Sequence, residues 1–371
     1  ESRNGRKDSA SMIKNAFEKI ASFEGLLQAE HDTALGRRDA PEELAFWDRK
    51  EDRLHEISRR LFDGDYPPDI YRTFYVYEPK LRKIVCSDYD TKVIQRSAYN
   101  VLNPLLCEGF ISDSYACIPG RGSLYAAKRL RSWMDYCASS GRKWYYLKAD
   151  CEKFFYRLDH NVLMTLYDHK IMDRRTMDFL DHYTCHASKA FGLPLGITNP
   201  MAIDDSELLW DKGVAIGGGM SHMSGNVYLD PLDQYAKRTL GLKMYVRCMD
   251  DIVVLMDDKA RLHETYEQLR DFLENRLLLN FNHKPAIRPI SCGCEFVGYM
   301  IKPGSMTLRK STSLRMKRRL AKVQDLYRRE EMSFEKANET VQSYIALMGK
   351  TDSAALRRSI FSTFVLSHNE E

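Results

Sequence analysis

Two adjacent carboxylates inside an otherwise apolar run constrain the fold of this chain more than any other feature. They are Asp250 and Asp251, within the stretch Tyr-Val-Arg-Cys-Met-Asp-Asp-Ile-Val-Val-Leu at residues 245–255. A short apolar strand lies on each side, so the sequence predicts that both acids belong to a hairpin turn. Burying two like charges side by side is costly through desolvation and repulsion. A divalent cation would cancel both costs, and hard oxygen ligands of this kind suit Mg²⁺.

The alternative interpretation of such a pair is an exposed polar turn. We favour that interpretation for Asp257-Asp258, at the far end of the same predicted strand.

A third acid comes about a hundred residues earlier. The stretch Lys143–Ala149 is predicted as a strand that delivers Asp150 at its end, and the aromatic pair Phe154-Phe155 follows. Two strands that each end in Asp can place three carboxylates around a pair of metal ions. In-line phosphoryl or nucleotidyl transfer needs that arrangement.

Length and charge set broad limits. The chain has 371 residues, enough for two or three domains, and 44% of them are hydrophobic, which supports a real core. A net charge of +4 excludes a globally basic binder but allows a local basic surface. Neither a membrane-spanning run nor a leader is recognised, so we expect a soluble, cytoplasmic protein. Nine cysteines without a framework spacing are predicted to be reduced thiols.

The order of the predicted elements indicates an α+β fold. Helical patterns fill the first 65 residues, with one helix face over residues 12–27 and a second helix from Pro41 to Asp63. Short strands and helices alternate from Tyr71 onward, and a basic helical region follows Gly304. In that region an apolar stripe is predicted to pack inward and a basic stripe to face outward. The basic stripe consists of Arg315, Arg318, Arg319 and Lys322.

At these residues the chain resembles the reverse transcriptases, over about residues 71–311. Cys248-Met-Asp250-Asp251 is similar to the family's Tyr-x-Asp-Asp box, with Cys248 where Tyr is usual. Residues 216–233 resemble the segment that supports template and nucleotide, and Phe296–Tyr299 resembles the primer-grip hairpin. These motifs follow one another in the family's order.

The resemblance implies a right-hand polymerase with fingers, a palm carrying a ferredoxin-like antiparallel sheet, and a helical thumb. It places the domains at 1–70 (N-terminal helical extension), 71–142 (fingers), 143–304 (palm, with an inserted segment near 190–212) and 305–371 (basic helical thumb).

It also implies roles for individual residues. The catalytic residues would be Asp150, Asp250, Asp251 and Lys284, the last near the pyrophosphate leaving group. Two Mg²⁺ ions, for which Mn²⁺ can substitute, would be held by Asp150, Cys151, Asp250 and Asp251. Nucleotide contacts would come from Lys80, Arg82, Lys92, Phe155, Ser221, His222 and Asn226. In this set Phe155 is the gate against ribose 2′-hydroxyl groups.

The expected function is RNA-templated DNA synthesis, and the similarity is greatest to enzymes of bacterial and phage diversity-generating retroelements. Two departures, His222 where that group has Gln and the extra piece from Gly192 to Trp210, favour an alternative. The alternative is an anti-phage defence reverse transcriptase that uses a dedicated non-coding RNA or no conventional primer. A silent RNA-binding module and a metal-dependent nuclease explain fewer of the motifs. The expected partners are a template RNA, a DNA primer or product, dNTPs, and an accessory protein or a second copy, with no membrane.

Overall fold

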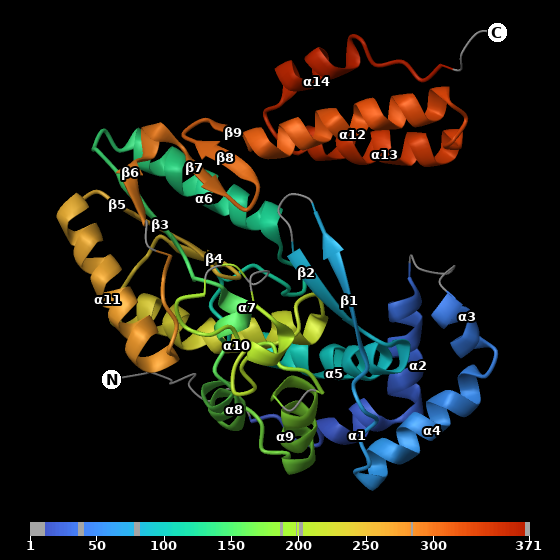
Figure 1. Cartoon of the computed structure of the whole chain (residues 1–371). Helices are drawn as coiled ribbons and strands as arrows, with labels where there is room; N and C mark the ends of the chain where they lie inside the picture. The colour runs from blue at the N-terminus through green and yellow to red at the C-terminus, as the bar shows by residue number, and fades with distance from the viewer. Residues whose placement is uncertain are drawn as a thin grey trace, which may run out of the picture. The chain divides into compact units, whose positions relative to one another are not determined.

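A computed structural model describes residues 12–35, 41–77, 82–185, 188–197, 199, 203–282 and 285–367, except for the side chains of residues 41, 42 and 82. Helices and antiparallel strands make up the fold (Figure 1), which confirms the predicted α+β class. Within these residues, no helix has the length and apolar character that crossing a bilayer would require.

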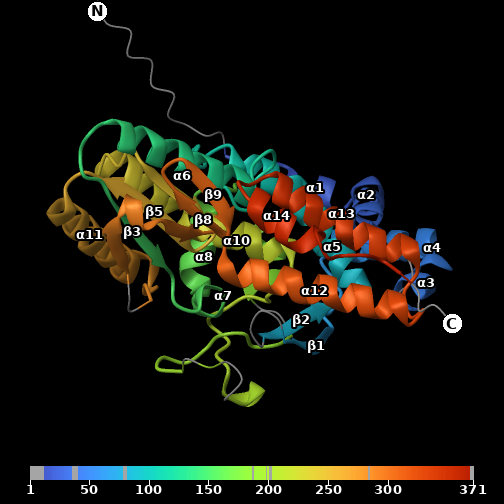
Figure 2. The same cartoon turned by 90° about the horizontal axis from the view of Figure 1, so that it is seen from above.

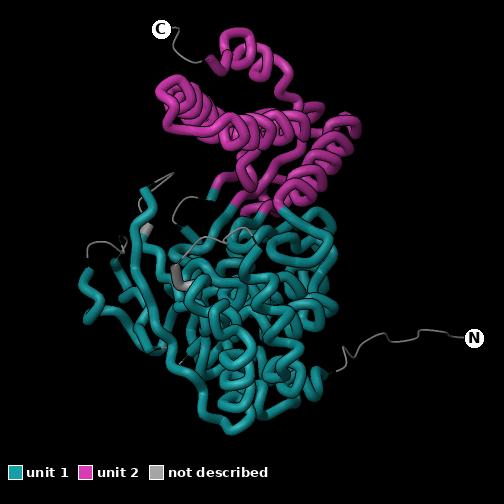
Figure 3. The backbone as a smooth tube through the Cα atoms, turned by 90° about the vertical axis from the view of Figure 1, so that its right-hand side faces the viewer, with its two compact units in different colours: residues 1–122, 149–252, 264–285 teal, residues 123–148, 253–263, 286–371 magenta. Residues whose placement is uncertain are grey.

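The chain forms two compact units, each assembled from segments that are distant in sequence (Figure 3). Unit 1 comprises residues 1–122, 149–252 and 264–285, and unit 2 comprises 123–148, 253–263 and 286–371. The boundaries of fingers, palm and thumb stay a prediction.

The strands are β1 Tyr71–Val76, β2 Arg82–Ser87, β3 Tyr145–Asp150, β4 Tyr245–Cys248, β5 Asp251–Met256, β6 Ala286–Pro289, β7 Cys294–Phe296, β8 Tyr299–Lys302 and β9 Ser305–Leu308. The α-helices are α1 Ala16–Ala21, α2 Phe23–Ala34, α3 Pro41–Trp47, α4 Lys50–Asp63, α5 Tyr89–Cys107, α6 Ser123–Ser139, α7 Phe154–Arg157, α8 His160–Asp168, α9 Arg174–Leu180, α10 Gly219–Gln234, α11 Lys259–Leu277, α12 Lys310–Arg328, α13 Phe334–Gly349 and α14 Ala354–Phe361. Short π-helices cover Asp181–Cys185 and Tyr235–Thr239, and 3₁₀ turns cover Asp205–Glu207 and Ile290–Cys292.

The N-terminal helices are more broken than the sequence predicted. The single helix face expected over residues 12–27 is split into α1 and α2 at Ser22, whose backbone is extended and whose hydroxyl accepts the Gly25 N–H at 3.1 Å. A serine that caps a new helix in this way satisfies donors that would otherwise be unpaired. The predicted end at Asp63 is confirmed, because Gly64 adopts the left-handed conformation that terminates α4. Helices α1 and α2 pack on α5 in unit 1.

A four-stranded sheet with the order β4-β5-β3-β6 carries the predicted acids. Strand β3 pairs antiparallel with β6, Tyr145 lying opposite Pro289. The apolar run Ile252–Leu255 is buried along its whole length, as its composition predicted. The strands predicted at 143–149, 243–247 and 252–255 are therefore confirmed, with ends shifted by one or two residues.

The hairpin β1–β2 and the inserted segment also belong to unit 1. The two strands pair antiparallel from Tyr71–Ser87 to Val76–Arg82. The inserted segment folds back on itself, since Gly192 and Leu209 exchange backbone hydrogen bonds of 2.9 and 2.8 Å. Figure 2 shows it as an irregular yellow-green loop with little regular structure.

Unit 2 combines a small antiparallel sheet with helices. Strands β7, β8 and β9 are consecutive neighbours, and α6 packs on β8 and β9. Helix α12 buries Met316, Leu320 and Val323. Its basic stripe, the exposed residues Arg315, Arg318, Arg319 and Lys322, faces away from that core, as predicted.

Candidate active site

The acid pair lies at the turn between β4 and β5, where the sequence predicted it. Met249 occupies the left-handed region at φ 58°, Asp250 follows it, and β5 begins at Asp251. Burial raises the pKa of Asp250 to about 6, and the negative charges of Asp251 and Asp150 add to the effect. The three acids therefore share one electrostatic field, although they come from two strands far apart in sequence.

Asp150 is the last residue of β3 and is fixed by a segment that precedes β6. The Asn282 backbone N–H donates to the Asp150 carbonyl at 2.8 Å, and the Asn282 side-chain amide donates to the Asp150 carboxylate. Glu152 N–H in turn donates to the Asn280 carbonyl at 2.8 Å. Asn282 was not singled out from the sequence. The alternation Leu-Asn-Phe-Asn at 279–282, typical of a strand-like edge, was the available signal.

The donor set suits a hard divalent cation. Carboxylate oxygens from Asp150, Asp250 and Asp251 are the ligands that Mg²⁺ prefers, and their mutual repulsion favours a cation between them. Within the described part of the chain, no three or more His, Cys, Asp or Glu side chains form a ready-made metal cluster. Magnesium commonly keeps several waters and substrate oxygens in its shell, so a fully assembled protein cage is not required.

Cys151 stays a prediction as a metal ligand. Its side chain is buried, burial raises the pKa of its thiol well above the usual range, and sulfur is a softer ligand than Mg²⁺ prefers. If Cys151 contributes to metal binding, its backbone carbonyl is the group that can do so.

Two predicted nucleotide contacts, Lys92 and Ser221, line one cavity of about 160 Å³ in unit 1. Hairpin β1–β2, the start of α5 and the glycine loop before α10 form its walls. The Ser221 hydroxyl donates to the Ala215 carbonyl and so closes that loop onto the first turn of α10. The cavity lining includes the cation of Lys92 and the amide of Gln95. These groups suit a small polar ligand.

Phe155 and His222 form a second predicted group. Their rings meet edge to face with centroids 5.6 Å apart, and the Phe154 ring lies tilted against Phe155 with centroids 5.1 Å apart. Burial lowers the pKa of His222, so its ring is neutral at pH 7. Helix α10 approaches this region closely at Gly225, where a Cβ atom would lie 2.9 Å from Phe154 and 3.1 Å from the Met249 sulfur.

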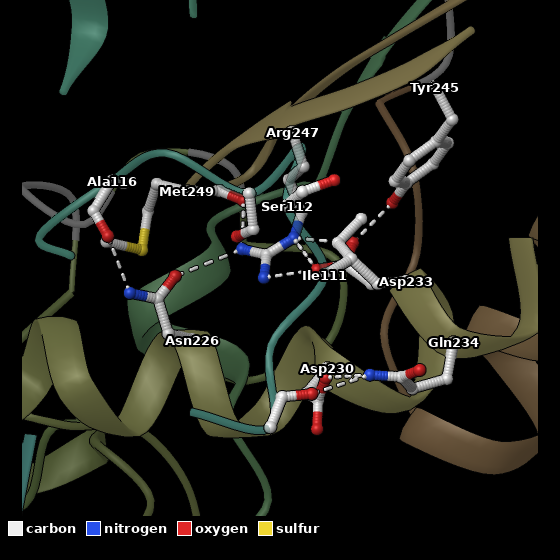
Figure 4. A network of polar contacts seen from close by, with 12 residues as sticks. Ile111, Ser112, Ala116, Asn226, Asp230, Asp233, Gln234, Tyr245, Arg247 and Met249 are labelled. Atoms are coloured by element: carbon white, nitrogen blue, oxygen red, sulfur yellow. Dashed lines mark hydrogen bonds and ion pairs between the residues drawn. The ribbon is translucent and has the colours of Figure 1, made fainter. Parts of the chain in front are cut away.

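Asn226 belongs to a buried polar network instead of an open pocket. Figure 4 shows the guanidinium of Arg247 between Asn226 and Asp233, with Tyr245 on the far side of Asp233. Arg247 and Asp233 are both completely buried. Arg247 was not selected from the sequence, although a charged residue within an apolar strand was a visible signal.

The remaining predicted cations are only partly described. Lys80 and Lys284 lie outside the described residues, and Arg82 is described only by its backbone, which pairs with Val76. Lys83 on β2, a further cation of the stretch that resembles the family's triphosphate-binding hairpin, forms an ion pair with Asp205 of the inserted segment. The same carboxylate accepts from Lys189 at 2.6 Å.

Comparison with known proteins agrees with this geometry. The family described as "Reverse transcriptase (RNA-dependent DNA polymerase)" matches residues 77–301. The group II intron-encoded protein LtrA of Lactococcus lactis subsp. cremoris is 22% identical over 243 residues, which are 63% of this chain and 37% of LtrA. The COX1/OXI3 intron 2 protein of Saccharomyces cerevisiae is 23% identical over 255 residues, 57% of this chain and 29% of that protein. The chain spans about a third of the length of these curated relatives.

Among solved structures, apo telomerase from Candida tropicalis matches with a TM-score of 0.47 and 12% identity, covering 64% of this chain and 55% of that one. Telomerase from Candida albicans matches with a TM-score of 0.42 and 13% identity, covering 80% and 55%.

Proposed function

This chain belongs to the reverse transcriptase (RNA-dependent DNA polymerase) family, and from that membership we propose that it copies an RNA template into DNA by nucleotidyl transfer. The observation that carries the proposal is the shared field of Asp150, Asp250 and Asp251. Burial first, and the charges of Asp251 and Asp150 in addition, raise the pKa of Asp250 to about 6. Such a field is unfavourable in the protein alone and favourable around divalent cations.

These three acids would hold two Mg²⁺ ions. When bound, the ions supply activation of the primer 3′-hydroxyl and neutralisation of the triphosphate. The chain's own residues position the acids. The Asn282 amide orients the Asp150 carboxylate, and Met249, in the αL conformation, forms the turn that Asp250 follows.

The nucleotide would be selected by neighbouring groups. We propose that Phe155, supported by His222 and Phe154, lies under the deoxyribose and leaves no room for a 2′-hydroxyl. A cation at Lys92, on the cavity it shares with Ser221, can attract phosphate oxygens. The exposed basic stripe of α12 would contact the backbone of a template–product duplex without reading its sequence.

The biological setting is proposed as a diversity-generating retroelement of a bacterium or phage. The Val-Tyr-Glu-Pro-Lys stretch at residues 76–80 and the Met-Asp-Asp-Ile-Val-Val-Leu run at residues 249–255 support this setting. The inserted segment near 190–212, which binds Lys83 through Asp205, favours the defence alternative because it departs from that pattern. Sequencing the RNA and DNA that copurify with the protein separates the two. A template with a protein-coding repeat indicates retrohoming, and a dedicated non-coding RNA with a repetitive product indicates defence.

The central test is primer extension. We expect the purified protein to extend a DNA primer on an RNA template with dNTPs and Mg²⁺. The doubly substituted protein Asp150→Asn, Asp250→Asn should bind the same template–primer but add no nucleotide. Extension by that variant would contradict the assignment of the acids, and failure of the wild type on every RNA template would contradict the function.

A further inference from the structure

A completely buried arginine, Arg247 on β4, lies just before the acid turn and has no role in the chemistry described above. Its side chain is 0% exposed. A buried charge is stable only when it is paired and its N–H groups are hydrogen-bonded. The partners of the Arg247 guanidinium therefore indicate what it does.

The charge is neutralised by Asp233 on α10. Arg247 Nε lies 2.8 and 2.9 Å from the two carboxylate oxygens, and Nη2 lies 2.7 Å from Oδ2. The Tyr245 hydroxyl adds a further hydrogen bond of 2.7 Å to Oδ1. These contacts account for the charge, but they leave Nη1 available for other acceptors.

Nη1 donates to the acid turn itself. It lies 2.9 Å from the carbonyl oxygen of Met249, the residue that immediately precedes Asp250. Met249 adopts the left-handed conformation, which residues other than glycine rarely take unless other contacts hold them there. A hydrogen bond to this carbonyl fixes the peptide plane from which Asp250 departs.

The Arg247 guanidinium also contacts Asn226 on α10, and Asn226 in turn contacts the loop at residues 113–116. Nη1 also lies 3.2 Å from the Asn226 side-chain oxygen, and the Asn226 amide donates to the Ala116 carbonyl at 2.7 Å. The backbone of Arg247 adds two hydrogen bonds to that loop, from its N–H to the Asp113 carbonyl at 3.0 Å and to its carbonyl from the Tyr115 N–H at 3.1 Å. One residue thus joins three parts of unit 1.

We propose that Arg247 is a positioning residue for nucleotidyl transfer, which fixes the Met249–Asp250 peptide so that the acid turn is formed before metal and substrate arrive. This inference rests on the proposed polymerase function. Arginine suits the task because its planar group offers five N–H donors in a fixed fork. A lysine at this position could keep the ion pair with Asp233, but it could not also reach Met249 and Asn226 in the same geometry.

The experiment compares Arg247→Lys with a matched control, Lys170→Met. Lys170 forms an ion pair of 2.8 Å with the buried Asp230 on the same helix. The Asp230 charge also acts on Arg247 and Asp233, but among the described residues no hydrogen bond or ion pair of Lys170 reaches the acid turn. We measure three quantities for each protein: the melting temperature without metal, Mn²⁺ binding by electron paramagnetic resonance, and primer extension as a function of dNTP and Mg²⁺.

For Arg247→Lys we expect Mn²⁺ binding to weaken about tenfold and kcat to fall about a hundredfold, the size of effect typical when a group that orients a metal ligand is lost. The KM for dNTP should change less than about threefold, because the nucleotide contacts are intact. Lys170→Met should lower the melting temperature while leaving Mn²⁺ binding and kcat near wild type.

A double variant, Arg247→Met with Asp233→Leu, separates positioning from stability. Replacing both partners of a buried ion pair by apolar residues commonly preserves or raises stability. We therefore expect a folded protein whose melting temperature is near wild type and whose Mn²⁺ binding and kcat are still impaired.

Full kcat and Mn²⁺ affinity in that double variant would overturn the proposal and leave Arg247 as a purely structural residue. The same conclusion follows if Arg247→Lys and Lys170→Met behave alike. If the wild type extends no primer, the polymerase function fails, and the difference in Mn²⁺ binding between the two single variants still decides the role of Arg247.

Discussion

The two ends of strand β5 carry the same dipeptide in opposite circumstances. At the start, Asp250 is half-buried, and desolvation together with the charges of Asp251 and Asp150 raises its pKa to about 6. At the far end, Asp257 forms an ion pair with Arg142. The Asp258 carboxylate there accepts hydrogen bonds from the N–H groups of Ala260 and Arg261, at 2.8 and 3.1 Å, in the first turn of α11.

The two pairs have the same sequence but different partners. The groups that neutralise an acid pair therefore identify its role better than the Asp-Asp sequence does. The protein itself compensates the second pair, with a cation and with the favourable start of a helix. The first pair keeps an unfavourable negative field inside the protein, and such a field is stable only if an outside cation relieves it. The apolar residues that flank Asp250-Asp251 predicted the same distinction, and the contacts give its physical basis.

Substituting one acid from each pair should produce the largest contrast. Asp250→Asn should lower the rate of primer extension by about a thousandfold, because a metal ligand contributes several kcal/mol to the transition state. Asp257→Asn should change the rate by less than about twofold, since an exposed ion pair contributes little. Single-turnover extension with excess enzyme measures both rates, and similar losses in the two variants would remove the contrast.

The pH dependence of stability in the absence of metal should separate the pairs next. The pKa of Asp250 in the folded protein lies above its ordinary value of 3.8, so the folded state binds this proton more tightly. The contribution of Asp250 to the free energy of unfolding is therefore fully present below about pH 4 and is lost as the pH rises through about 6, a loss of about 3 kcal/mol.

Chemical denaturation in EDTA between about pH 4 and pH 7 tests this expectation. Asp250→Asn should flatten the pH dependence relative to wild type, whereas Asp257→Asn should keep it. Identical curves for wild type and Asp250→Asn would show that Asp250 does not carry an unfavourable charge.

The same comparison, between charges that the protein itself neutralises and charges that await a partner, applies to the exposed cations on α12. Changing Arg315, Arg318, Arg319 and Lys322 together to Gln should weaken binding to an RNA–DNA hybrid by about tenfold near 0.1 M salt, because each phosphate contact releases counterions. The slope of log affinity against log salt should become shallower by about 3. Arg59→Gln on α4, an exposed cation paired within its own helix, is the control. An unchanged slope would mean that α12 is a solvated face and not a duplex contact.

The smallest effect is expected at Asp205. Like Asp257 it is paired with cations of the protein, but one of these cations, Lys83, belongs to the hairpin that is proposed to hold the triphosphate. Its side chain is 47% exposed, and hydrogen bonds from Lys189 and Lys83 hold its pKa below the usual range. Asp205→Asn should free Lys83 to attract a triphosphate and lower the KM for dNTP by about two- to fivefold, as expected for a partly exposed ion pair. Asp211→Asn, in the same segment, should leave KM unchanged. A higher KM in Asp205→Asn would show that the contact supports nucleotide binding instead of competing with it.

The sequence was sufficient where the pattern is local. The apolar runs at 245–248 and 252–255 predicted the two strands and the turn, because a buried hairpin needs little beyond hydrophobic residues and a tight connection. The break at Ser22 was missed, since a capping serine can interrupt a continuous apolar face without changing its periodicity. The break between α3 and α4 was missed as well, and Arg49, which precedes α4, makes no capping hydrogen bond with its side chain.

The supporting contacts of the site could not be predicted from pattern alone. Asn282 and Asp205 act on residues more than a hundred positions away, and tertiary pairing decides which carboxylate or lysine they meet. Arg247 was visible as a charge in an apolar strand, but its partner Asp233 lies in a helix whose buried face also holds other polar residues. For His222, the resemblance drew attention to substrate contact, and the structure adds a ring contact with Phe155.

Two contacts support the acid site, Arg247–Asp233 and Asp150–Asn282, and they join residues at very different separations in the sequence. This difference bears on the order in which the protein folds. Arg247 and Asp233 are only 14 residues apart, whereas Asp150 and Asn282 are 132 residues apart. Short loops close at lower entropic cost than long ones, so we expect the Arg247–Asp233 contact to form early and the Asp150–Asn282 contact to form late. A chain emerging from the ribosome would then acquire its acid turn well before it could complete the site. Premature metal binding by the nascent protein would be limited for the same reason.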